Sequence, residues 1–492
     1  MIAVERDAEK RDTETHRRGD AAKDRNGKAE RVSQQTEKSS VIADDLPRLR
    51  VPASPRRFSV HVAWTVAARL LMTVNSVAAG VIVARWLGAE GLGQLAVINV
   101  AVATIVQLSS AGLPSANTYF IARDKSHFAP AAVNSLIFAL VVGGLLALCL
   151  TGAAVWRPGW FGFISPRLIG IASISIPFQL ITLVGLNIFL AVGRVGRFNL
   201  FDLVGQSFVL VNAIVALVIL NAGLWLLVSL NAGASVVIAI LIVALIGAYG
   251  AQMKERVAWR PDLRLFGRMM RYGLKFHISI LAGALIFRAD LLVVNHFRGG
   301  AEAGVYSVAS QVAMMLMLLP GVIATLLFPR VAAKRDETGG LTCVVTRHTA
   351  FVMLCLCLLA APLSFVLPIL YGAAFADVSV QLLILLPGVY LIGLESILVQ
   401  HFNAVGLPMA IPLFWVATLA INVALVFGLV PPFGARGAAL ASTVSYALIF
   451  ALVAIYFRMY TRRKLSEMFF LSGSELRELF AAQRLKVSSK RA

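Results

Sequence analysis

The chain has 492 residues, of which 59% are hydrophobic and only 14% charged, and its formal net charge is +20 at pH 7. Soluble domains carry roughly 45–50% apolar and about 25% charged residues, so this composition excludes an ordinary water-soluble fold. The basic residues lie mostly in tails and short connectors beside apolar segments, which favours orientation in a membrane over binding of nucleic acid.

Residues 1–57 have a composition of their own, rich in Lys, Arg, Asp and Glu, with Pro47, Pro52 and Pro55. Such a segment buries too little apolar area to offset the entropy lost on ordering, so we predict a disordered, charged tail. It lacks the apolar stretch and small-residue cleavage site of a secretory signal, and we therefore expect it to remain in the cytoplasm.

Twelve later stretches are each long enough and apolar enough to cross about 30 Å of hydrocarbon as a helix. They cover residues 60–84, 93–115, 131–155, 167–191, 199–221, 223–250, 272–296, 303–328, 344–370, 379–402, 408–430 and 436–457. Their apolarity is continuous rather than alternating, and open sheet edges cannot lie in lipid. The sequence therefore predicts an all-α integral membrane protein.

The connectors between these stretches differ in charge. With the N-terminus inside, the connectors on the cytoplasmic side hold fourteen Lys and Arg residues, and those on the other side hold five. Because positive charge accumulates on cytoplasmic connectors, this asymmetry fits an even number of spans and places both termini in the cytoplasm. We expect a multi-pass protein of a bacterial inner membrane.

The longest connector, residues 252–271, has the pattern of an amphipathic helix. One helical face carries three arginines and the opposite face two apolar residues: Arg264, Arg268 and Arg271 against Leu263 and Met270. This pattern predicts a short helix on the inner leaflet, where basic side chains meet anionic head groups. A charged linker between two halves of the protein is the alternative.

Two motifs recur about 210 residues apart. Ala89-Glu90-Gly91-Leu92-Gly93 is matched by Ala301-Glu302-Ala303-Gly304, and Ala191-Val192-Gly193 by Ala404-Val405-Gly406, with Asn212 and Asn422 following the second pair. This offset maps the first six spans onto the last six in the same orientation. We predict an N-terminal bundle at 58–251 and a C-terminal bundle at 272–458, followed by a basic cytoplasmic tail at 459–492.

Further short motifs occur in order between residues 60 and 460. They are Ala84-Arg85-Trp86-Leu87-Gly88-Ala89-Glu90-Gly91-Leu92-Gly93, Ser110-Ala111-Gly112-Leu113-Pro114, Arg288-Ala289-Asp290, Gly304-Val305-Tyr306-Ser307, Leu319-Pro320-Gly321, Phe328-Pro329-Arg330, Leu370-Tyr371-Gly372 and Phe433-Gly434-Ala435-Arg436-Gly437-Ala438-Ala439. In this order along twelve predicted helices, the chain resembles the multidrug/oligosaccharidyl-lipid/polysaccharide (MOP) exporter superfamily. Within it, the chain resembles the Wzx-type polysaccharide and O-antigen flippases.

The resemblance implies a MATE-like fold of two bundles about a central cavity, with alternating access to its two sides. The implied cargo is an oligosaccharide on a polyprenyl diphosphate of the undecaprenyl type, flipped from the cytoplasmic to the periplasmic leaflet. Exopolysaccharide or lipopolysaccharide biosynthesis, with a polymerase and export machinery as partners, is the implied context. Related lipid II flippases typically carry two further C-terminal helices, which the sequence does not show after Tyr460. A cation-coupled multidrug exporter of the same superfamily is the main alternative.

Ionisable side chains within spans are costly and usually face protein or a wet cavity. Arg69 and Arg288 are candidates to bind a diphosphate, because a guanidinium matches pairs of phosphate oxygens. A clamp between helices is the alternative for Arg69. We expect further polar residues of the spans to line the cavity: Asn75, Gln107, His277 and Asn295. Polar residues in membrane helices also join neighbouring helices, and a lone histidine is often structural.

Three carboxylic residues within spans are candidates for coupling to an ion gradient: Asp202, Asp290 and Glu395. Asp202 and Glu395 are also candidates to balance the charge of an arginine. Asp290 follows Arg288 by two residues and points to a different side of the helix, so we expect it to contact another helix rather than Arg288. An anchor near the outer interface is the alternative for Asp290.

Signatures of an enzyme are poor. No Gly-rich phosphate loop opens a soluble domain, so ATP hydrolysis is not expected. The four cysteines show no metal-ligand spacing with histidine, and neither a metal nor another cofactor is expected. A membrane glycosyl polymerase or ligase would act on the same lipid carrier, but it normally needs a sizeable outer loop. The outer connectors have only about 6 to 16 residues, which favours a transporter.

Overall fold

A computed structural model describes residues 55–162, 164–253, 259–334, 338–405 and 408–469. Most of the predicted tails at 1–57 and 459–492, and Gly406 of the second repeat motif, lie outside the described residues. The described part is helical and contains no strand, which confirms the all-α prediction. Its helices belong to one compact unit.

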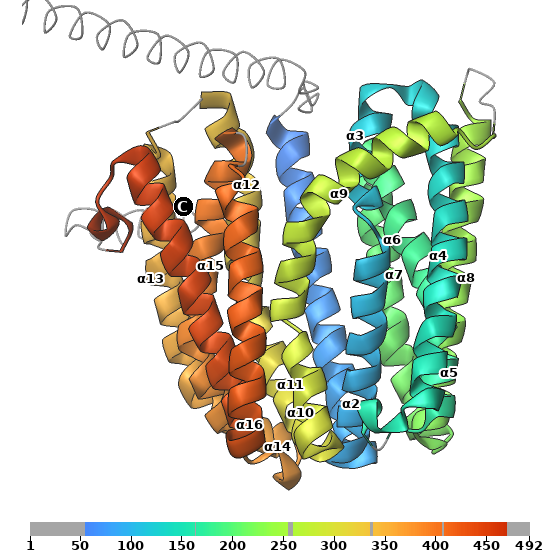
Figure 1. The fold of residues 1–492 in the computed structure, drawn as a ribbon, viewed down its shortest axis with the longest axis vertical. Coiled ribbons are helices and arrows are strands. Elements are labelled where there is room, and N and C mark those ends of the chain that lie inside the picture. Colours follow the sequence, from blue (N-terminus) through green and yellow to red (C-terminus); the bar gives the residue numbers. More distant parts are fainter. Residues whose placement is uncertain (1–54, 163, 254–258, 335–337, 406–407, 470–492) are drawn as a thin grey trace, which may run out of the picture. The chain divides into compact units, whose positions relative to one another are not determined.

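The helices follow one another in two groups. The first group is α2 (Pro55–Ser109), α3 (Leu113–Arg123), α4 (Phe128–Trp156), α5 (Pro166–Ser173), α6 (Ser175–Ala191), α7 (Val195–Ala213) and α8 (Gly223–Ala251). The second is α9 (Leu263–Ile286), α10 (Ala289–Arg298), α11 (Gly300–Met315), α12 (Leu318–Lys334), α13 (Gly340–Leu363), α14 (Leu367–Tyr371), α15 (Val378–Val405) and α16 (Ala410–Thr461). Short turns of other helix types are η1 (Lys125–His127), η2 (Pro158–Phe161), η3 (Ile214–Ile219), η4 (Ser364–Val366), η5 (Ala373–Phe375) and η6 (Leu465–Met468). In Figure 1, α4–α8 lie at the right and α13–α16 at the left, with α2 and α11 packed together between them.

Ten helical segments of the described residues are long and apolar enough to cross a membrane. Two of them far exceed the roughly 20 residues that one crossing needs: Ala67–Ser109 has 43 residues and Ala410–Thr461 has 52. Each contains a glycine with non-helical backbone, Gly88 (φ 69°) in α2 and Gly434 (φ 60°) in α16, which divides it into two arms. The predicted total of twelve counts every arm as a span, and that total stays a prediction.

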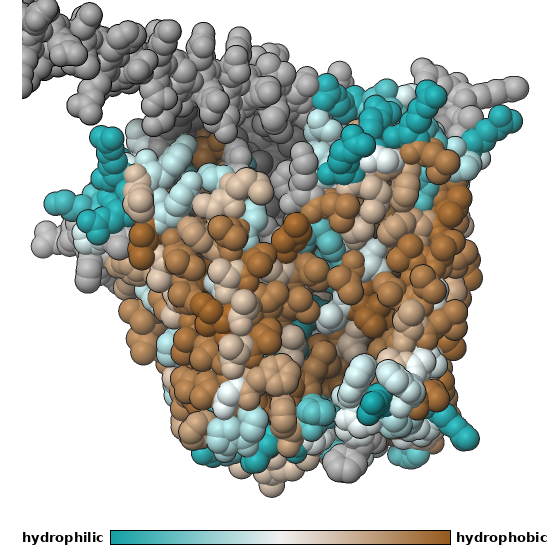
Figure 2. Space-filling view, viewed as in Figure 1, coloured by the Kyte–Doolittle hydropathy of each residue, from teal (hydrophilic) through white to brown (hydrophobic). Residues whose placement is uncertain are grey.

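Outward-facing side chains of the helices are apolar between the two polar ends. Leu148 on α4, for example, is 72% exposed. In Figure 2, hydrophobic surface in brown covers the middle of the face shown, and hydrophilic surface in teal gathers toward both ends. Such a surface is unfavourable in water but suits lipid, so the chain is a multi-pass membrane protein.

Glycines with positive φ mark equivalent turns in the two halves. A positive φ strains any residue with a Cβ, which explains why glycine recurs at these positions. Three pairs are each about 210 residues apart: Gly88 and Gly299, Gly162 and Gly372, and Gly223 and Gly434. These turns confirm the predicted parallel repeat.

The two asparagines predicted to be equivalent also make equivalent contacts. Asn212 Nδ2 donates to Asn231 Oδ1 (2.9 Å) and joins α7 to α8. Asn422 Nδ2 donates to Ser445 Oγ (3.0 Å) and joins the two arms of α16. In each half, therefore, a hydrogen bond from asparagine joins the last two apolar segments.

The two halves meet where α2 and α11 pack backbone against backbone. A Cβ on Gly93 would lie 1.8 Å from the Gly300 carbonyl oxygen, and a Cβ on Gly304 would lie 2.0 Å from that of Ala89. Small residues four apart on each helix permit this approach. We call Ala89, Gly93, Gly300 and Gly304 the glycine seam. Both copies of the first repeat motif thus contribute to one contact.

The basic connector forms a longer helix than predicted. The Asp262 carboxylate accepts hydrogen bonds from the backbone N–H groups of Arg264 (2.9 Å) and Leu265 (3.0 Å), a normal N-cap. From there α9 continues without a break to Ile286, inside the stretch predicted as the seventh span. The basic segment is therefore not a separate helix. No break in the backbone separates it from the apolar stretch that begins at residue 272.

Candidate functional site

Arg69 lies on the first arm of α2 and pairs with a carboxylate on α7. Its Nη2 is 3.6 Å from Asp202 Oδ2, and the two side chains are 48% and 23% exposed. Further along α2, Asn75 Nδ2 donates to Ser207 Oγ of α7 (3.0 Å). The structure thus brings together three of the predicted residues, and it gives Arg69 the interhelical contact that was the alternative to substrate binding.

Arg288 stands at the break between α9 and α10. Its backbone (φ −138°, ψ −25°) leaves the helical conformation, and the neighbouring Phe287 packs on Trp415 and Tyr446 of α16. The Arg288 side chain is exposed and makes no hydrogen bond or ion pair with any residue that the structure describes. Within that part of the chain, its positive charge is therefore not neutralised.

Asp290 is buried where α10, α11 and α16 meet. Its carboxylate accepts hydrogen bonds from the Tyr306 hydroxyl, from Ser442 Oγ (2.8 Å) and from the backbone N–H of Leu291 (2.8 Å). Hydrogen bonds to a carboxylate are among the stronger ones in proteins, so this group joins three helices. Asp290 contacts other helices rather than Arg288.

Glu395 is buried in α15. Its Oε1 has no hydrogen-bond partner among the described residues, and the Trp415 side chain of α16 lies beside its carboxyl group. An ionised carboxylate in such surroundings is costly, because burial removes water and supplies Oε1 with no donor among the described residues. Glu395 therefore differs from Asp202, which has an arginine beside it.

The remaining predicted residues lie at opposite ends of the helices. His277 on α9 is buried close to the Leu108 backbone, yet neither ring nitrogen reaches normal hydrogen-bond geometry with a described residue. Gln107, next to Leu108 on α2, is half-buried. Asn295 donates from Nδ2 to the Phe161 carbonyl (3.1 Å) and joins α10 to η2. The six candidate binding residues therefore do not form one cluster.

A polar cluster between the halves was not predicted. Gln311 Nε2 on α11 donates to Ser76 Oγ on α2 (2.6 Å), and the buried Tyr371 hydroxyl of α14 lies beside Gly80 of α2. We call Ser76, Gln311 and Tyr371 the Ser76 cluster. The signal available in the sequence was a glutamine in the middle of an apolar stretch.

The halves also meet at the other end, where the start of α9 packs on α3 and α4, but the contacts of α2 with α11 and α14 gather toward the end of the helices that holds Gly88. The glycine seam lies there, and the Ser76 cluster lies next to it along α2. Close to Gly88, Arg85 donates from Nε to the Leu370 carbonyl (2.9 Å). Arg69 lies beyond the Ser76 cluster, about 28 Å along α2 from Gly88 at 1.5 Å per residue. The Arg69–Asp202 pair is therefore well separated from the glycine seam.

The described residues contain no group of three or more His, Cys, Asp or Glu that could hold a metal ion. Of the predicted charged residues, Arg69 and Asp202 form a pair, Asp290 is satisfied by hydroxyl and N–H donors, and Arg288 has a charge without a partner among the described residues. Such an arrangement can attract and hold an anion, but it offers no nucleophile activated by a neighbouring base.

Comparison with known proteins identifies the family. Residues 56–334, more than half of the chain, match the family described as polysaccharide biosynthesis protein. A curated relative, the probable flippase AglR of Haloferax volcanii, is 29% identical over 171 residues, which cover 32% of this chain and 35% of that protein. The match thus spans about a third of the length of the relative.

Solved structures share the fold. An inward-facing multidrug resistance MATE transporter of the MOP superfamily superposes with a TM-score of 0.66 at 16% identity, over 80% of this chain and 94% of that one. The lipid II flippase MurJ, in an inward closed conformation, gives 0.64 at 15% identity, over 83% and 89%. These likenesses confirm the predicted MATE-like fold. The relatives are flippases and transporters rather than enzymes, in agreement with the prediction, and the chain belongs to the polysaccharide biosynthesis protein family.

Proposed function

We propose that this chain flips an oligosaccharide, linked to a polyprenyl diphosphate of the undecaprenyl type, from the cytoplasmic to the periplasmic leaflet of a bacterial inner membrane. In this proposal it is a Wzx-type flippase for exopolysaccharide or lipopolysaccharide biosynthesis and supplies a polymerase and export machinery. The observation that carries the proposal is the family match over residues 56–334, a range that contains both Arg69 and Arg288.

The diphosphate is the part of such a cargo that resists transfer through lipid, because moving a charge out of water is costly. Arg288 is the residue best suited to meet it, since its guanidinium is exposed and has no carboxylate partner in the described chain. Arg69 is a second contact. Its 3.6 Å separation from Asp202 exceeds that of a close charged hydrogen bond, so a phosphate oxygen can compete for the guanidinium.

The end of the helices that holds the glycine seam is the periplasmic end in this proposal, and the end at which α9 begins is cytoplasmic. The glycine seam and the Ser76 cluster then close the outer side while the cargo enters from within. Release requires the seam to open, as expected for alternating access between two related halves. Gln107 and Asn75, which are half-buried, would contact the glycan, and the buried His277 would contact it once the helices around it move apart.

Coupling to an ion gradient is assigned to the buried carboxyl groups. Glu395 is the first candidate, because its Oε1 lacks a partner in the described part and is free to bind a proton or Na⁺. Asp290 is the second, although three donors already occupy its carboxylate. Asp202 would act through its pairing with Arg69.

A multidrug exporter is the second candidate function, since the solved MATE transporters share the fold. Exporters of lipophilic cations favour acidic or aromatic binding sites, whereas the unpaired charge of Arg288 would repel a cation. A polymerase or ligase is disfavoured by the short connectors, such as that between α4 and α5, which holds little beyond η2.

Flipping is tested with the purified chain in proteoliposomes that contain a short-chain lipid-linked oligosaccharide. A glycosidase added outside cuts only the exposed glycan, so the protein should raise the cleaved fraction from about half toward completion. Arg288→Gln should slow this at least about tenfold, as expected for loss of a charged contact worth about 1.5–3 kcal/mol. Arg330→Gln, an exposed arginine on α12, is the matched control and should leave the rate unchanged.

The Arg69–Asp202 pair allows a sharper comparison. If Arg69 binds phosphate, Arg69→Gln should slow flipping, while Asp202→Asn should preserve binding of the cargo because it leaves the guanidinium available. Equal losses in both variants would assign the pair a purely structural role. If the protein transports a lipophilic cation and leaves the cleaved fraction of the glycan unchanged, the chain is an exporter and not a flippase.

A further inference from the structure

The first half of α9 presents an outward face with two different edges. At about 100° per residue, Leu263 and Leu274 fall within about 20° of each other on the helix. Arg264, Arg268 and Arg271 fall within an arc of about 60°, centred roughly a quarter turn away. All five side chains are exposed, the two leucines at 80% and 47%. We call these the leucine edge and the arginine edge.

Packing on the opposite face fixes how these edges are oriented. Asn134 of α4 makes two hydrogen bonds with the Asp262 backbone. The Asn134 Nδ2 donates to the Asp262 carbonyl (2.8 Å), and the Asn134 Oδ1 accepts from the Asp262 N–H (3.1 Å). Tyr272 stacks on Tyr119 of α3 with ring centroids 4.5 Å apart. Gly273 also approaches the Gly112 backbone so closely that a Cβ would lie 2.8 Å away. The start of α9 therefore cannot rotate without losing contacts with α3 and α4.

The arginine edge has little negative charge near it. Asp262, which caps the helix, is one described carboxylate beside it, and the hydrogen bond from the Leu265 N–H holds the pKa of that carboxyl below its usual value. Arg268 lies over the Phe120 ring at 6.0 Å, which brings the edge close to Arg123 and Lys125 and to one further carboxylate, Asp124. The local charge of this surface is therefore positive, and an anion would find few competing carboxylates.

We propose that the arginine edge binds the phosphate groups of anionic phospholipids while the leucine edge enters the adjoining acyl region, so that the start of α9 and the helices α3 and α4 on which it packs are anchored to one leaflet. Two edges a quarter turn apart match a surface that is charged at one depth and apolar at the next. A soluble anion would use the arginines alone and would leave the leucines in water. Trp259, exposed just before the helix, is a residue type enriched at this depth.

The size of the effect follows from the number of charges. A basic residue near an anionic leaflet is worth about 1 kcal/mol, so three together correspond to roughly 100-fold in lipid affinity at low ionic strength. Because these side chains are exposed, salt should screen the effect over a Debye length of about 10 Å at 0.1 M. The proposal concerns lipids and does not depend on the identity of the cargo.

The test uses the full chain in detergent, titrated with phosphatidylglycerol or phosphatidylcholine, with bound lipid counted by native mass spectrometry. The variant Arg264→Gln/Arg268→Gln/Arg271→Gln should lose most of its preference for phosphatidylglycerol. The control Arg330→Gln/Arg458→Gln/Arg462→Gln removes the same charge from exposed arginines of α12 and of the end of α16 and should keep that preference. In vesicles, Leu263→Ser/Leu274→Ser should weaken attachment of this helix to charged and neutral lipid alike.

Three results would overturn the proposal. The two triple variants could lose lipid equally, which would make the effect one of net charge. The α9 variant could keep its full preference for phosphatidylglycerol. Soluble pyrophosphate could stabilise the protein where phosphatidylglycerol does not, which would assign the edge to a free phosphate ligand instead. Melting temperatures of all variants, measured without added lipid, separate these results from misfolding.

Discussion

Replacing Gly304 by alanine should open the contact between the two halves. The added Cβ would lie 2.0 Å from the Ala89 carbonyl oxygen and 3.0 Å from the Gly93 nitrogen. Carbon atoms need about 3.5 Å from their neighbours, so α2 and α11 would have to separate by more than about 1 Å. The obstacle is backbone on both sides, and no flexible side chain can move away to make room.

The cost of this overlap sets the expected shift. Overpacking of a tight contact costs about 1–3 kcal/mol. If the overlap raises the free energy of the closed state alone by about 2 kcal/mol, the ratio of closed to open molecules falls about 30-fold. A protein that is closed in 99% of molecules would then be closed in only about three-quarters of them. Alanine also favours the helix over glycine by up to about 1 kcal/mol. The free energy of unfolding should therefore change less than the free energy difference between the closed and open states.

Opening of the glycine seam is measured as a loss of cross-linking within the Ser76 cluster. Cysteines at positions 76 and 311, in a chain whose four native cysteines are replaced, should be joined efficiently by a short bifunctional thiol reagent, because the native side chains are hydrogen-bonded at 2.6 Å. Gly304→Ala should lower the yield. Gly300→Ala is the matched control one turn away, where the added Cβ would meet its nearest atom at an ordinary 3.5 Å.

Equal cross-linking in the Gly300 and Gly304 variants would refute the reasoning, since it would mean that the helices adapt without separating. A lower yield accompanied by a collapse in melting temperature would also count against it. The seam would then be a rigid joint whose loss unfolds the protein rather than a contact that opens.

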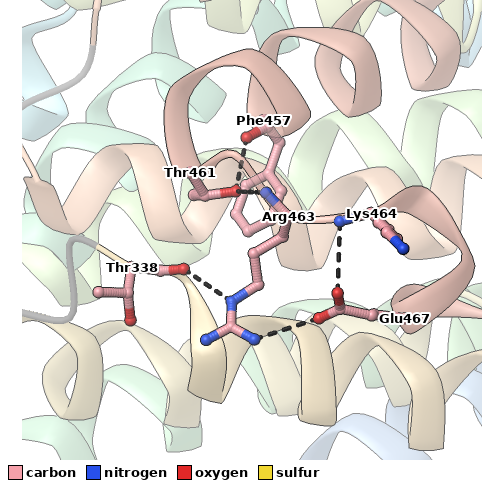
Figure 3. Close-up of polar contacts among 6 residues, drawn as sticks. All are labelled: Thr338, Phe457, Thr461, Arg463, Lys464 and Glu467. Carbon is pink, nitrogen blue, oxygen red and sulfur yellow. Dashed lines mark hydrogen bonds and ion pairs between the residues drawn. The ribbon is translucent and has the colours of Figure 1, made fainter.

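Three further changes test individual contacts. Asp290→Asn should destabilise the chain by about 2–4 kcal/mol in denaturant unfolding, because its amide replaces an acceptor that three donors share, whereas Ser442→Ala should cost only about 1 kcal/mol. The hydrogen bond from Arg463 holds the pKa of Glu467 below its usual 4.5. The Arg463–Glu467 contact in Figure 3 is therefore complete above pH 4.5 and is lost as the pH falls below it. A spin label near η6 should become mobile at low pH in the native chain, and at every pH in Glu467→Gln. Glu395→Gln should abolish the dependence of transport on a proton or Na⁺ gradient while leaving the melting temperature nearly unchanged, and an unaltered ion dependence would remove Glu395 from coupling.

Much of the fold could be predicted because lipid imposes simple rules on sequence. Apolar length identified the helices, and two glycines of the short motifs, Gly88 and Gly434, lie at turns whose positive φ favours glycine. The long α9 was not predicted. Charge and apolarity divide residues 252–271 from the span that follows, but the backbone continues helically as long as no residue breaks it.

The contacts of the candidate site were less predictable for a different reason. Helical periodicity assigns a residue to a face of its own helix, but it does not identify the neighbour on that face. Arg69 and Asp202 are far apart in sequence and meet only because α2 packs on α7. Gln311 likewise reaches Ser76 from the other half of the chain. Such pairs depend on the register of two helices, which no local pattern records.

The pairing of Arg69 changes the electrostatic argument for transport. Two unpaired arginines would hold a diphosphate strongly, and a carrier that binds too strongly cannot release its cargo. Because Arg69 is paired with Asp202, of these two arginines only Arg288 has a charge without a partner among the described residues. The charge of Arg69 becomes available to an anion only if the anion displaces Asp202. In the proposed cycle, Asp202 pairs with Arg69 again when the diphosphate leaves, so the arginine keeps a partner throughout. The pair therefore lowers the cost of release as well as the strength of binding, which suits a flippase better than two free charges would.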